Sequence, residues 1–443
     1  MEKVKLAPLI KVEKENGTRK VTVSKLGKTI FSIALYAIFI LVVFLSEKNL
    51  GAFDNFVIAL EFGAIYAVIA LSMNMTNGFT GIFSLGQAGF MLLGAYVFAI
   101  FTIPPEIKDV VYLNGVYSFV RNAYVPIPVA YLIAGAVCAL VAYLIGLVVL
   151  RFKSDYLAIA TIGFIEIVRA VINFLPKATN GSNPLTGIPT FSDMLYKIAP
   201  NAESGSVTLC VIICSVCIAL MVLVLSSAYG RSFRAVRDDD IAAESMGINL
   251  ARTKRISFTV SGFFAGIGGA IFAMAQGGSI NTSAASFGLD LTYFILLIVV
   301  VGGMGSVTGS VIGGFLVYSL REWWLEFCNH EVFIGSVKLP LFGTGFKMLV
   351  FAIIILAIVL FFRKGIMGNR EFSWNGILTY FANVKAHLKA FGKGFVNFFK
   401  NLPKNIKRFG VFIGTSVKKY VLIAVNFIKN LFKKNKKGDG ANE

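Results

Sequence analysis

Residues that commonly perform acid–base chemistry are scarce in this sequence of 443 residues. It has only two histidines, His330 and His387, and no paired nucleophile and base is visible. Gly27-Lys28-Thr29 resembles the end of a phosphate-binding loop, but Thr22 stands where that motif needs a glycine. We therefore expect a chain that is not an enzyme, binds no metal or cofactor, and does not bind ATP by itself.

Cysteine is also scarce, with five in the chain. Cys210, Cys214 and Cys217 have the C-x3-C-x2-C spacing of some iron–sulfur enzymes, and on a helix these positions share one face. They lie inside a long apolar run that offers a cluster no polar surroundings. We interpret them as small packing residues, and the sequence predicts no disulfide framework.

Charged residues are few as well, at 15%, against 56% hydrophobic residues and a mean hydropathy of +0.76. No soluble domain can bury so much apolar surface, so the sequence predicts an all-α polytopic membrane protein. A helix of about 18 or more apolar residues crosses a hydrocarbon core of about 30 Å. About ten such spans are expected, at 29–46, 55–75, 82–103, 125–150, 156–176, 206–228, 256–276, 289–302, 307–325 and 345–363.

Lysine and arginine are distributed unevenly between the segments that join these spans. With the N-terminus inside, inside segments hold 33 of the 42 and outside loops hold six. This asymmetry predicts that both termini are cytoplasmic. The chain then divides into a basic segment (1–28), a transmembrane domain (29–363) with a cytoplasmic loop (229–256), and a basic tail (364–443). The net charge of +19 suits an anionic inner leaflet, and nucleic-acid binding is not expected.

Two glycine-rich stretches interrupt the apolar runs. "GGMGSVTGSVIGG" carries Gly305, Gly309 and Gly313 at intervals of four, and "NGFTGIFSLGQAGFMLLGAY" precedes and enters the third expected span. Such glycines permit tight static packing of helices, or they allow helices to bend around a pathway. Both interpretations stay open, and the candidate pathway residues from these stretches are Gly86, Gln87, Gly303 and Gly305.

Ionisable residues within the spans are a second set of pathway candidates. Glu166 and Arg169 are three positions apart and can pair on one helix face. A buried structural pair is the simpler interpretation, and contact with a substrate is the alternative. Asn173 lies near the end of this span, and the loop Thr179–Pro189 follows on the outer side, adding Gly181 and Asn183.

The stretch from Arg231 to Arg255 holds ten charges in 25 residues. "RSFRAVRDDDIAAESMGINLARTKRISFTVSGFFAGIGGAIFA" resembles the cytoplasmic loop and next span of branched-chain amino-acid ABC transporter permeases of the LivM type. "FSLGQAGFMLLGAY", "YLAIATIGFIEIVRAVINFLPKATNGSNPLTGIP" and "VGGMGSVTGSVIGGFL" resemble the same family in the same order. The resemblance covers roughly residues 55–365.

The resemblance implies an ABC importer permease fold in a bacterial cytoplasmic (inner) membrane. The chain would be one permease subunit, paired with a second, LivH-like subunit. Two cytoplasmic ATPase subunits would drive import of a branched-chain amino acid delivered by an extracytoplasmic substrate-binding protein. An ion-coupled secondary transporter of a small metabolite, using Glu166 and Arg169, is the alternative, and a membrane enzyme comes third.

The resemblance also assigns a role to a short helix expected at about Asp240 to Ile248. It would be the coupling helix that docks on an ATPase, since Ala242, Ala243 and Gly247 keep the family spacing A-A-x-x-x-G. Ile241 stands where the general pattern has Glu, and Asp240 and Glu244 supply acid nearby. From the residues alone, the helix has an apolar face within a charged rim, which suits docking. A solvated linker helix is the other interpretation.

The tail changes in character after Phe362. Residues 364–443 hold 16 Lys or Arg and three Asp or Glu, and apolar residues recur every three or four positions from Leu388 to Ile413. This pattern predicts a basic amphipathic helix, interrupted near Pro403, on the inner membrane surface. Docking on the ATPases is the alternative. The residues expected to contact lipid are Lys389, Lys393, Lys400 and Lys404.

Overall fold

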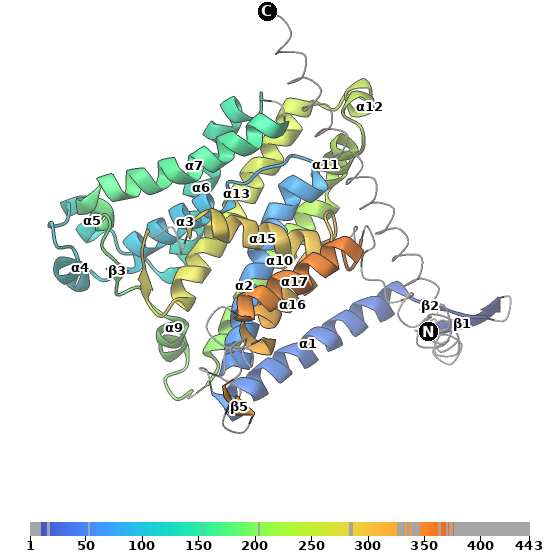
Figure 1. Cartoon of the computed structure of the whole chain (residues 1–443), viewed down its shortest axis with the longest axis horizontal. Coiled ribbons are helices and arrows are strands. Elements are labelled where there is room, and N and C mark those ends of the chain that lie inside the picture. Colours follow the sequence, from blue (N-terminus) through green and yellow to red (C-terminus); the bar gives the residue numbers. More distant parts are fainter. Residues whose placement is uncertain are drawn as a thin grey trace, which may run out of the picture. The chain divides into compact units, whose positions relative to one another are not determined.

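The computed structural model describes residues 10–15, 18–51, 54–152, 154–202, 204–282, 287–325, 333–334, 337–338, 346–361, 365–368, 371 and 375. The chain forms two units, the first made of Met1–Phe31 with Ser373–Glu443 and the second of Ser32–Phe372. The second unit holds nearly all the described helices (Figure 1).

Six helices in the described ranges are long and apolar enough to cross a membrane. A seventh span arises if α3 (Gln87–Thr102) and α4 (Pro105–Val111) are counted together, although they meet at 118°. The chain is therefore a helical, multi-pass membrane protein, and the count of ten spans stays a prediction. The six helices are α1 (Lys25–Leu50), α2 (Asn55–Asn74), α6 (Ile127–Val149), α7 (Ser154–Phe174), α10 (Ser206–Ser226) and α13 (Leu250–Ala275).

The other expected spans form shorter helices. The segment predicted at 82–103 becomes helical only at Gln87, because residues 81–86 form a loop after the π-helical turn η1 (Met75–Phe79). The segment predicted at 307–325 is α16 (Val307–Ser319) followed by a second π-helical turn, η2 (Leu320–Trp324). The remaining helices are α5 (Ser118–Asn122), α8 (Pro176–Thr179), α9 (Phe191–Ile198), α11 (Ala228–Asp238), α12 (Asp240–Ser245), α15 (Leu289–Gly302) and α17 (Phe346–Phe361).

The chain is mostly helical, as predicted, but it is not purely so, because the described residues also form three small antiparallel sheets. In the first unit, β1 (Ile10–Glu15) pairs with β2 (Thr18–Val23), from Ile10 opposite Val23 to Glu15 opposite Thr18. Alternating valines flank Asn16-Gly17 there, a common hairpin sequence. In the second unit, β3 (Leu185–Thr186) pairs with β4 (Ser279–Ile280), and β5 (Phe333–Ile334) pairs with β6 (Val337–Lys338).

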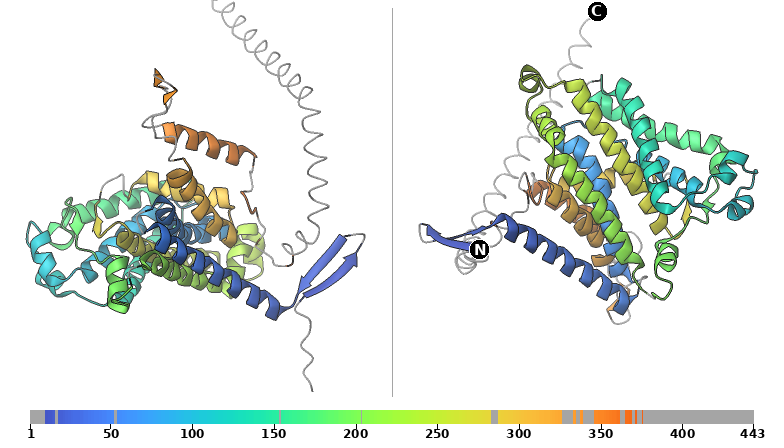
Figure 2. Two further views of the ribbon diagram at one scale, coloured as in Figure 1. Left: turned by 90° about the horizontal axis from the view of Figure 1, so that it is seen from below. Right: turned by 180° about the vertical axis from the view of Figure 1, so that it is seen from behind.

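The core of the second unit is built on α2 and α13, whose apolar stretches are the most buried of the span-length helices. α13 packs against α2, α3 and α6, and α2 packs against α10 and α16 (Figures 1 and 2). Glycines let these backbones approach closely: Gly94 of α3 lies against Gly266 of α13, and Gly314 of α16 lies against Ala67 of α2.

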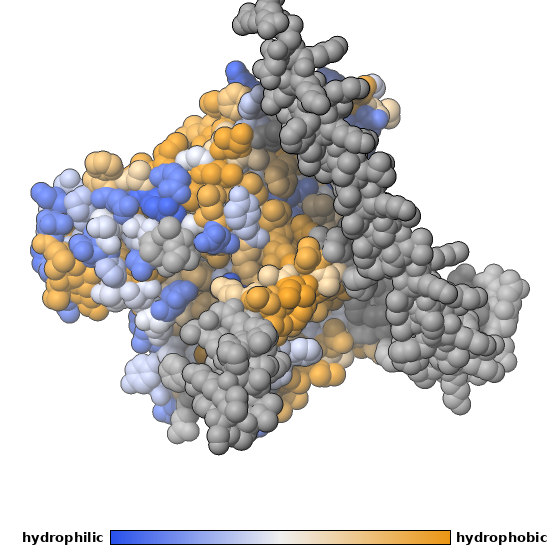
Figure 3. All heavy atoms as spheres, viewed as in Figure 1, coloured by the Kyte–Doolittle hydropathy of each residue, from blue (hydrophilic) through white to orange (hydrophobic). Residues whose placement is uncertain are grey.

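α1 is the exception among the span-length helices, because only 6% of its apolar stretch is buried. Its exposed side chains include Ile33, Ile38 and Leu41. Hydrophobic residues also cover much of the middle of the face drawn in Figure 3, and hydrophilic residues gather toward its margins. Such a surface is stable only when lipid or another membrane protein surrounds it.

Candidate functional site

Two ends of the helical unit hold the sequence-predicted residues. The helix α9 comes just before α10, and the helices α11 and α12 come just after it. We therefore call the two ends of the unit the α9 end and the α12 end (Figure 1). The expected docking residues and Gly303 and Gly305 lie at the α12 end. The loop 179–189, with Gly181 and Asn183, lies at the α9 end, where β3 pairs with β4.

The charge-dense loop folds as two short helices. α11 buries Phe233 and Val236 against the bundle. Asp239 then breaks the helix and caps α12, since its carboxylate accepts hydrogen bonds from the N–H groups of Ile241 and Ala242, at 2.9 and 3.0 Å. Acidic side chains at this position also interact favourably with the helix dipole.

α12 is shorter than the helix predicted at Asp240 to Ile248, because it ends at Ser245. The N–H of Gly247 donates to the carbonyl of Glu244, and the N–H of Ile248 donates to the carbonyl of Ala243. This double closure is a Schellman motif, which requires a left-handed residue, and Gly247 has φ +84°. Gly247 therefore closes the C-terminal end of α12.

The α12 surface is mostly exposed. Ile241 and Met246 are 79% and 83% exposed, and Asp240, Ala242 and Glu244 are exposed as well. Ala243 alone of the predicted docking residues is buried. The helix is nevertheless held in place, because Lys254 of α13 forms an ion pair with Asp240 at 2.7 Å. α12 thus presents apolar side chains on a fixed support.

The α12 end also contains a buried polar junction that the sequence did not predict. Asn74, at the last turn of α2, is fully buried. Its amide nitrogen donates to the carbonyl of Ser306 at 3.0 Å and to the hydroxyl of Ser310 at 2.7 Å. Its amide oxygen accepts from the N–H of Gly305 at 2.9 Å. One side chain thereby ties α2 to the start of α16.

The segment after α17 also binds the end of α15 and the start of α16. The N–H groups of Ile366 and Met367 donate to the carbonyls of Val301 and Gly302. Glu371 accepts hydrogen bonds from the N–H groups of Val307 and Thr308, at 2.7 and 3.2 Å, and so caps α16 with a negative charge. Three segments distant in sequence therefore meet around the loop 303–306.

The predicted glycines have different roles. Gly309 and Gly313 pack on Gly302 of α15, which supports static packing for these two positions. Gly303 and Gly305 lie in the loop between α15 and α16 with positive φ, so they break the helix. Gly86 is the N-cap of α3 and lies against Thr161 of α7. Gln87 is buried, and its amide donates to the hydroxyl of Ser72.

Glu166 and Arg169 form the expected pair on α7, with their closest atoms 2.7 Å apart. The pair is not buried as expected: the Glu166 side chain is 54% exposed and that of Arg169 is 15% exposed. Arg169 also donates to the carbonyl of Phe287 at 3.2 Å. Asn173 is exposed one turn further on, and its amide oxygen accepts from the hydroxyl of Thr282.

Glu166, Arg169 and Asn173 form a polar face on α7. The same span-length helix also exposes apolar residues such as Ile167 and Val171. An exposed carboxylate is costly in hydrocarbon, so such a face is stable against water or protein rather than lipid tails. After α8, which follows α7, Asn180 and Gly181 both adopt positive φ, and the N–H of Asn183 donates to the carbonyl of Asn180. Glu166, Arg169, Asn173 and this loop form one continuous group, separate from the glycines of the α12 end.

Glu47 of α1 is a further residue that the sequence did not reveal. Its carboxylate is buried at the start of α10, a helix whose N-cap, Gly205, has no side chain to cap it. It accepts hydrogen bonds from the N–H groups of Gly205, Val207 and Thr208, at 2.8 to 3.1 Å, and from the hydroxyls of Ser206 and Thr208. Glu47 therefore attaches the exposed α1 to the α9 end.

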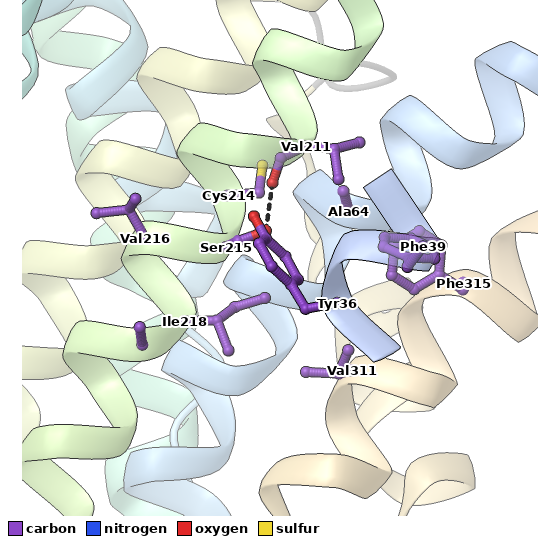
Figure 4. A pocket seen from close by; sticks show the side chains of 11 residues that line it. Tyr36, Phe39, Ala64, Val211, Cys214, Ser215, Val216, Ile218, Val311 and Phe315 are labelled. Atoms are coloured by element: carbon purple, nitrogen blue, oxygen red, sulfur yellow. Dashed lines mark hydrogen bonds between the residues drawn. The ribbon is translucent and has the colours of Figure 1, made fainter. Parts of the chain in front are cut away.

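An apolar cavity of about 500 Å³ lies between α1, α2, α10 and α16 (Figure 4). Its lining includes Phe39, Val211, Cys214, Ile218 and Phe315, and the Ser215 hydroxyl turns to the carbonyl of Val211. Tyr36 adds one phenolic hydroxyl, and none of the lining side chains is charged, so the two charged ends of an amino acid would find no charged partner. The cavity therefore suits a hydrocarbon chain, and it is separate from the pathway candidates.

The tail residues Lys389, Lys393, Lys400 and Lys404 lie outside the described residues. The membrane-surface helix stays a prediction.

Comparison with known proteins identifies the family. The family described as branched-chain amino acid transport system, permease component, matches residues 55–359. The high-affinity branched-chain amino acid transport system permease protein LivM of Escherichia coli is 32% identical over an alignment of 289 residues, and the match covers 60% of this chain and 63% of that protein. The match therefore spans less than two thirds of LivM.

More distant relatives include a probable branched-chain amino acid transport permease protein, LivH, of Methanocaldococcus jannaschii, 24% identical over 70% of this chain and 90% of that protein. The autoinducer 2 import system permease protein LsrC of Klebsiella pneumoniae is 27% identical over 46% of this chain and 60% of that protein. No solved structure matches the chain. With more than half of its length matched, the chain belongs to the family of permease components of branched-chain amino acid transport systems.

Proposed function

We propose that this chain is one of two permease subunits of an ATP-driven, binding-protein-dependent importer of branched-chain amino acids in a bacterial cytoplasmic membrane. A second, LivH-like permease subunit would complete the pathway, two cytoplasmic ATPase subunits would supply the energy, and an extracytoplasmic binding protein would deliver the substrate. Relatives with LivM and LsrC names support an importer, and the LivM match favours leucine, isoleucine or valine. The chain itself performs no hydrolysis in this scheme.

The proposed orientation places the α12 end in the cytoplasm. The excess of lysine and arginine in the predicted inside segments supports ten spans with both termini inside. In this arrangement 1–28 and 364–443 are cytoplasmic segments and 229–256 is a cytoplasmic loop within the domain 29–363. Glu47 and the loop 179–189 then lie on the outer side, where substrate would arrive.

The observation that carries the proposal is the surface of α12. Ile241 and Met246 are exposed apolar residues on a helix that is capped and ion-paired to α13. A solvated linker has no need of either feature, whereas a fixed helix with an apolar face and an acidic rim suits a groove on a soluble partner. We therefore assign ATPase docking to Asp240, Ile241, Ala242, Glu244 and Gly247, whereas Ala243, which is buried, would hold α12 against the bundle.

The proposed pathway follows the polar face of α7. Glu166, Arg169 and Asn173 would face water or the second permease subunit, with Gly181 and Asn183 at its outer mouth. Gly86 lies against the buried side of α7, at Thr161 and Phe164, so a bend of α3 at Gly86 and Gln87 would shift α7 and move its polar face with it. Gly303 and Gly305 would provide the corresponding break between helices on the inner side.

The docking proposal predicts that Ile241→Asp abolishes transport. The substitution places an unpaired charge in an apolar contact, which costs several kcal/mol when that contact forms. We expect the complex purified through this chain to lose most of its ATPase, and leucine uptake to fall to background. Ile241→Val, which keeps the apolar surface, is the matched control and should retain both.

Because Ile241 is exposed, neither variant disturbs the fold. Wild-type ATPase retention and uptake in Ile241→Asp would show that α12 is a solvated connector. Leucine uptake driven by an ion gradient without ATP would instead favour the secondary-transporter alternative.

The tail proposal predicts that a synthetic peptide of residues 385–415 becomes helical on anionic vesicles. Apolar residues at helical spacing would insert below the headgroups while lysines contact lipid phosphates. Circular dichroism with phosphatidylglycerol vesicles measures the transition, and neutral phosphatidylcholine vesicles are the control. A peptide that stays unstructured with both would remove the surface-helix proposal.

A further inference from the structure

Arg237, the next-to-last residue of α11, reaches from the loop that carries α12 into the bundle. Its Nη1 donates to the carbonyl of Gly78, in the π-helical turn after α2, at 3.2 Å. Its Nε and Nη2 hold one carboxylate oxygen of Asp238 at 3.0 and 2.8 Å. The carboxylate therefore orients the guanidinium, and the remaining edge of the guanidinium binds the backbone of the turn η1 that follows α2.

Two glycines make room for this side chain. A Cβ at Gly81 would lie 3.3 Å from Cγ of Arg237, and a Cβ at Gly305 would lie 2.6 Å from its Nη1. Gly305 also has φ +83°, a conformation that other residues rarely adopt. The arginine is thus enclosed by the loop between α2 and α3 on one side and the loop between α15 and α16 on the other.

These two loops are also connected to each other. Gly78 packs on the backbone N–H of Gly305, and Asn74 accepts a hydrogen bond from that same N–H. A displacement of α11 that moves Arg237 must therefore move Gly78 and press on Gly305. The junction lies where α2 ends and α16 begins, so both helices receive the displacement.

We infer that Arg237 is the positioning residue that transmits movement of the docking helix to the ends of α2 and α16. The inference rests on the proposed function, because it assumes that an ATPase moves α12. Ile241 would bind the partner, whereas Arg237 would convert the partner's movement into a change of the pathway. Loss of Arg237 should therefore uncouple ATP hydrolysis from transport, while the ATPase stays bound to the permease.

Arg237→Gln in the full complex tests this role, with Arg231→Gln as the control. Arg231 lies on the same helix and bonds to the carbonyl of Ser226, at the end of α10. We expect Arg237→Gln to retain the ATPase and to hydrolyse ATP at a rate within about twofold of wild type, while leucine uptake per ATP falls by about tenfold or more. Arg231→Gln should keep the wild-type ratio.

The ratio of uptake to hydrolysis distinguishes transmission from a merely structural role, because misfolding lowers both together. Arg237→Lys keeps the charge but loses the fork that binds Gly78 and Asp238 together, so we expect partial rescue of the ratio. A wild-type ratio in Arg237→Gln, or loss of the ATPase as in Ile241→Asp, would overturn the inference.

A second matched pair tests the junction from its other side. Gly305→Ala puts a methyl group against the guanidinium, whereas Gly115→Ala imposes similar backbone strain, at φ +78°, in open space. We expect Gly305→Ala to lower the uptake-to-hydrolysis ratio and Gly115→Ala to leave it unchanged. Equal ratios in the two would contradict the inference. Failure of the docking proposal can be distinguished from failure of this inference. Only if the docking proposal is wrong does Ile241→Asp keep its ATPase and its leucine uptake.

Discussion

Replacing Asn74 by leucine is expected to destabilise the chain by about 2–4 kcal/mol and to abolish uptake. Leucine is similar in volume, so the effect comes from lost hydrogen bonds rather than from a cavity. The buried N–H of Gly305 loses its acceptor, and the hydroxyl of Ser310 loses a donor. A buried polar group without its partner costs about 1–3 kcal/mol, because no water replaces the bond.

Thermal unfolding in detergent measures this loss, which corresponds to a midpoint lower by about 2–5 °C in a chain of this length. Asn55→Leu is the matched control, since Asn55 is exposed at the other end of the same helix. It should change stability by no more than about 0.5 kcal/mol. An unchanged midpoint for Asn74→Leu would mean that the buried amide does not hold α2 to α16.

Replacing Glu47 by alanine is expected to free the start of α10 and to detach α1. Five hydrogen bonds to one carboxylate disappear, and the N–H groups of Gly205, Val207 and Thr208 lose their acceptor. Bonds to a charged group are worth about 1.5–3 kcal/mol each, so even partial replacement by water leaves a cost of about 3–5 kcal/mol. Glu47→Gln, which keeps one acceptor oxygen, should lose less.

Amide hydrogen exchange at Gly205, Val207 and Thr208 measures this loss directly, because Glu47 accepts hydrogen bonds from those three N–H groups. Exchange should accelerate strongly in Glu47→Ala and moderately in Glu47→Gln. Glu106→Ala, at an exposed position on α4, is the control and should leave the exchange unchanged. Unchanged protection in Glu47→Ala would show that α10 holds its first turn without α1.

Much of the fold was predictable from the sequence because a membrane span depends on local composition. The expected spans at 55–75, 125–150 and 206–228 match α2, α6 and α10 within a few residues. The hairpin β1–β2 was missed, although Asn16-Gly17 between alternating valines is a usable signal. α12 was predicted too long, because the reversal at Gly247 closes the helix earlier than its apolar spacing indicates.

The contacts that organise the site were not predictable in this way. Asn74 meets Gly305 across 231 positions and Arg237 meets Gly78 across 159. No periodicity in one segment reports on a partner so distant. A polar residue in an apolar run shows that a partner exists, but only the packing of α2, α11 and α16 identifies it. The exposure of Glu166 likewise depends on which face of α7 packs inward.

The bond between Glu47 and α10 also sets an order of events while the chain is being made. Its acceptor and donors are separated by about 160 positions. At a synthesis rate of about 5–20 residues per second, roughly 10–30 seconds pass between them. During that interval α1 is in the bilayer and its carboxylate has no helix start to bind, so it must remain hydrated at the membrane surface. α1 can take its final position only after the sixth expected span has begun to enter, which makes its docking a late step of biogenesis.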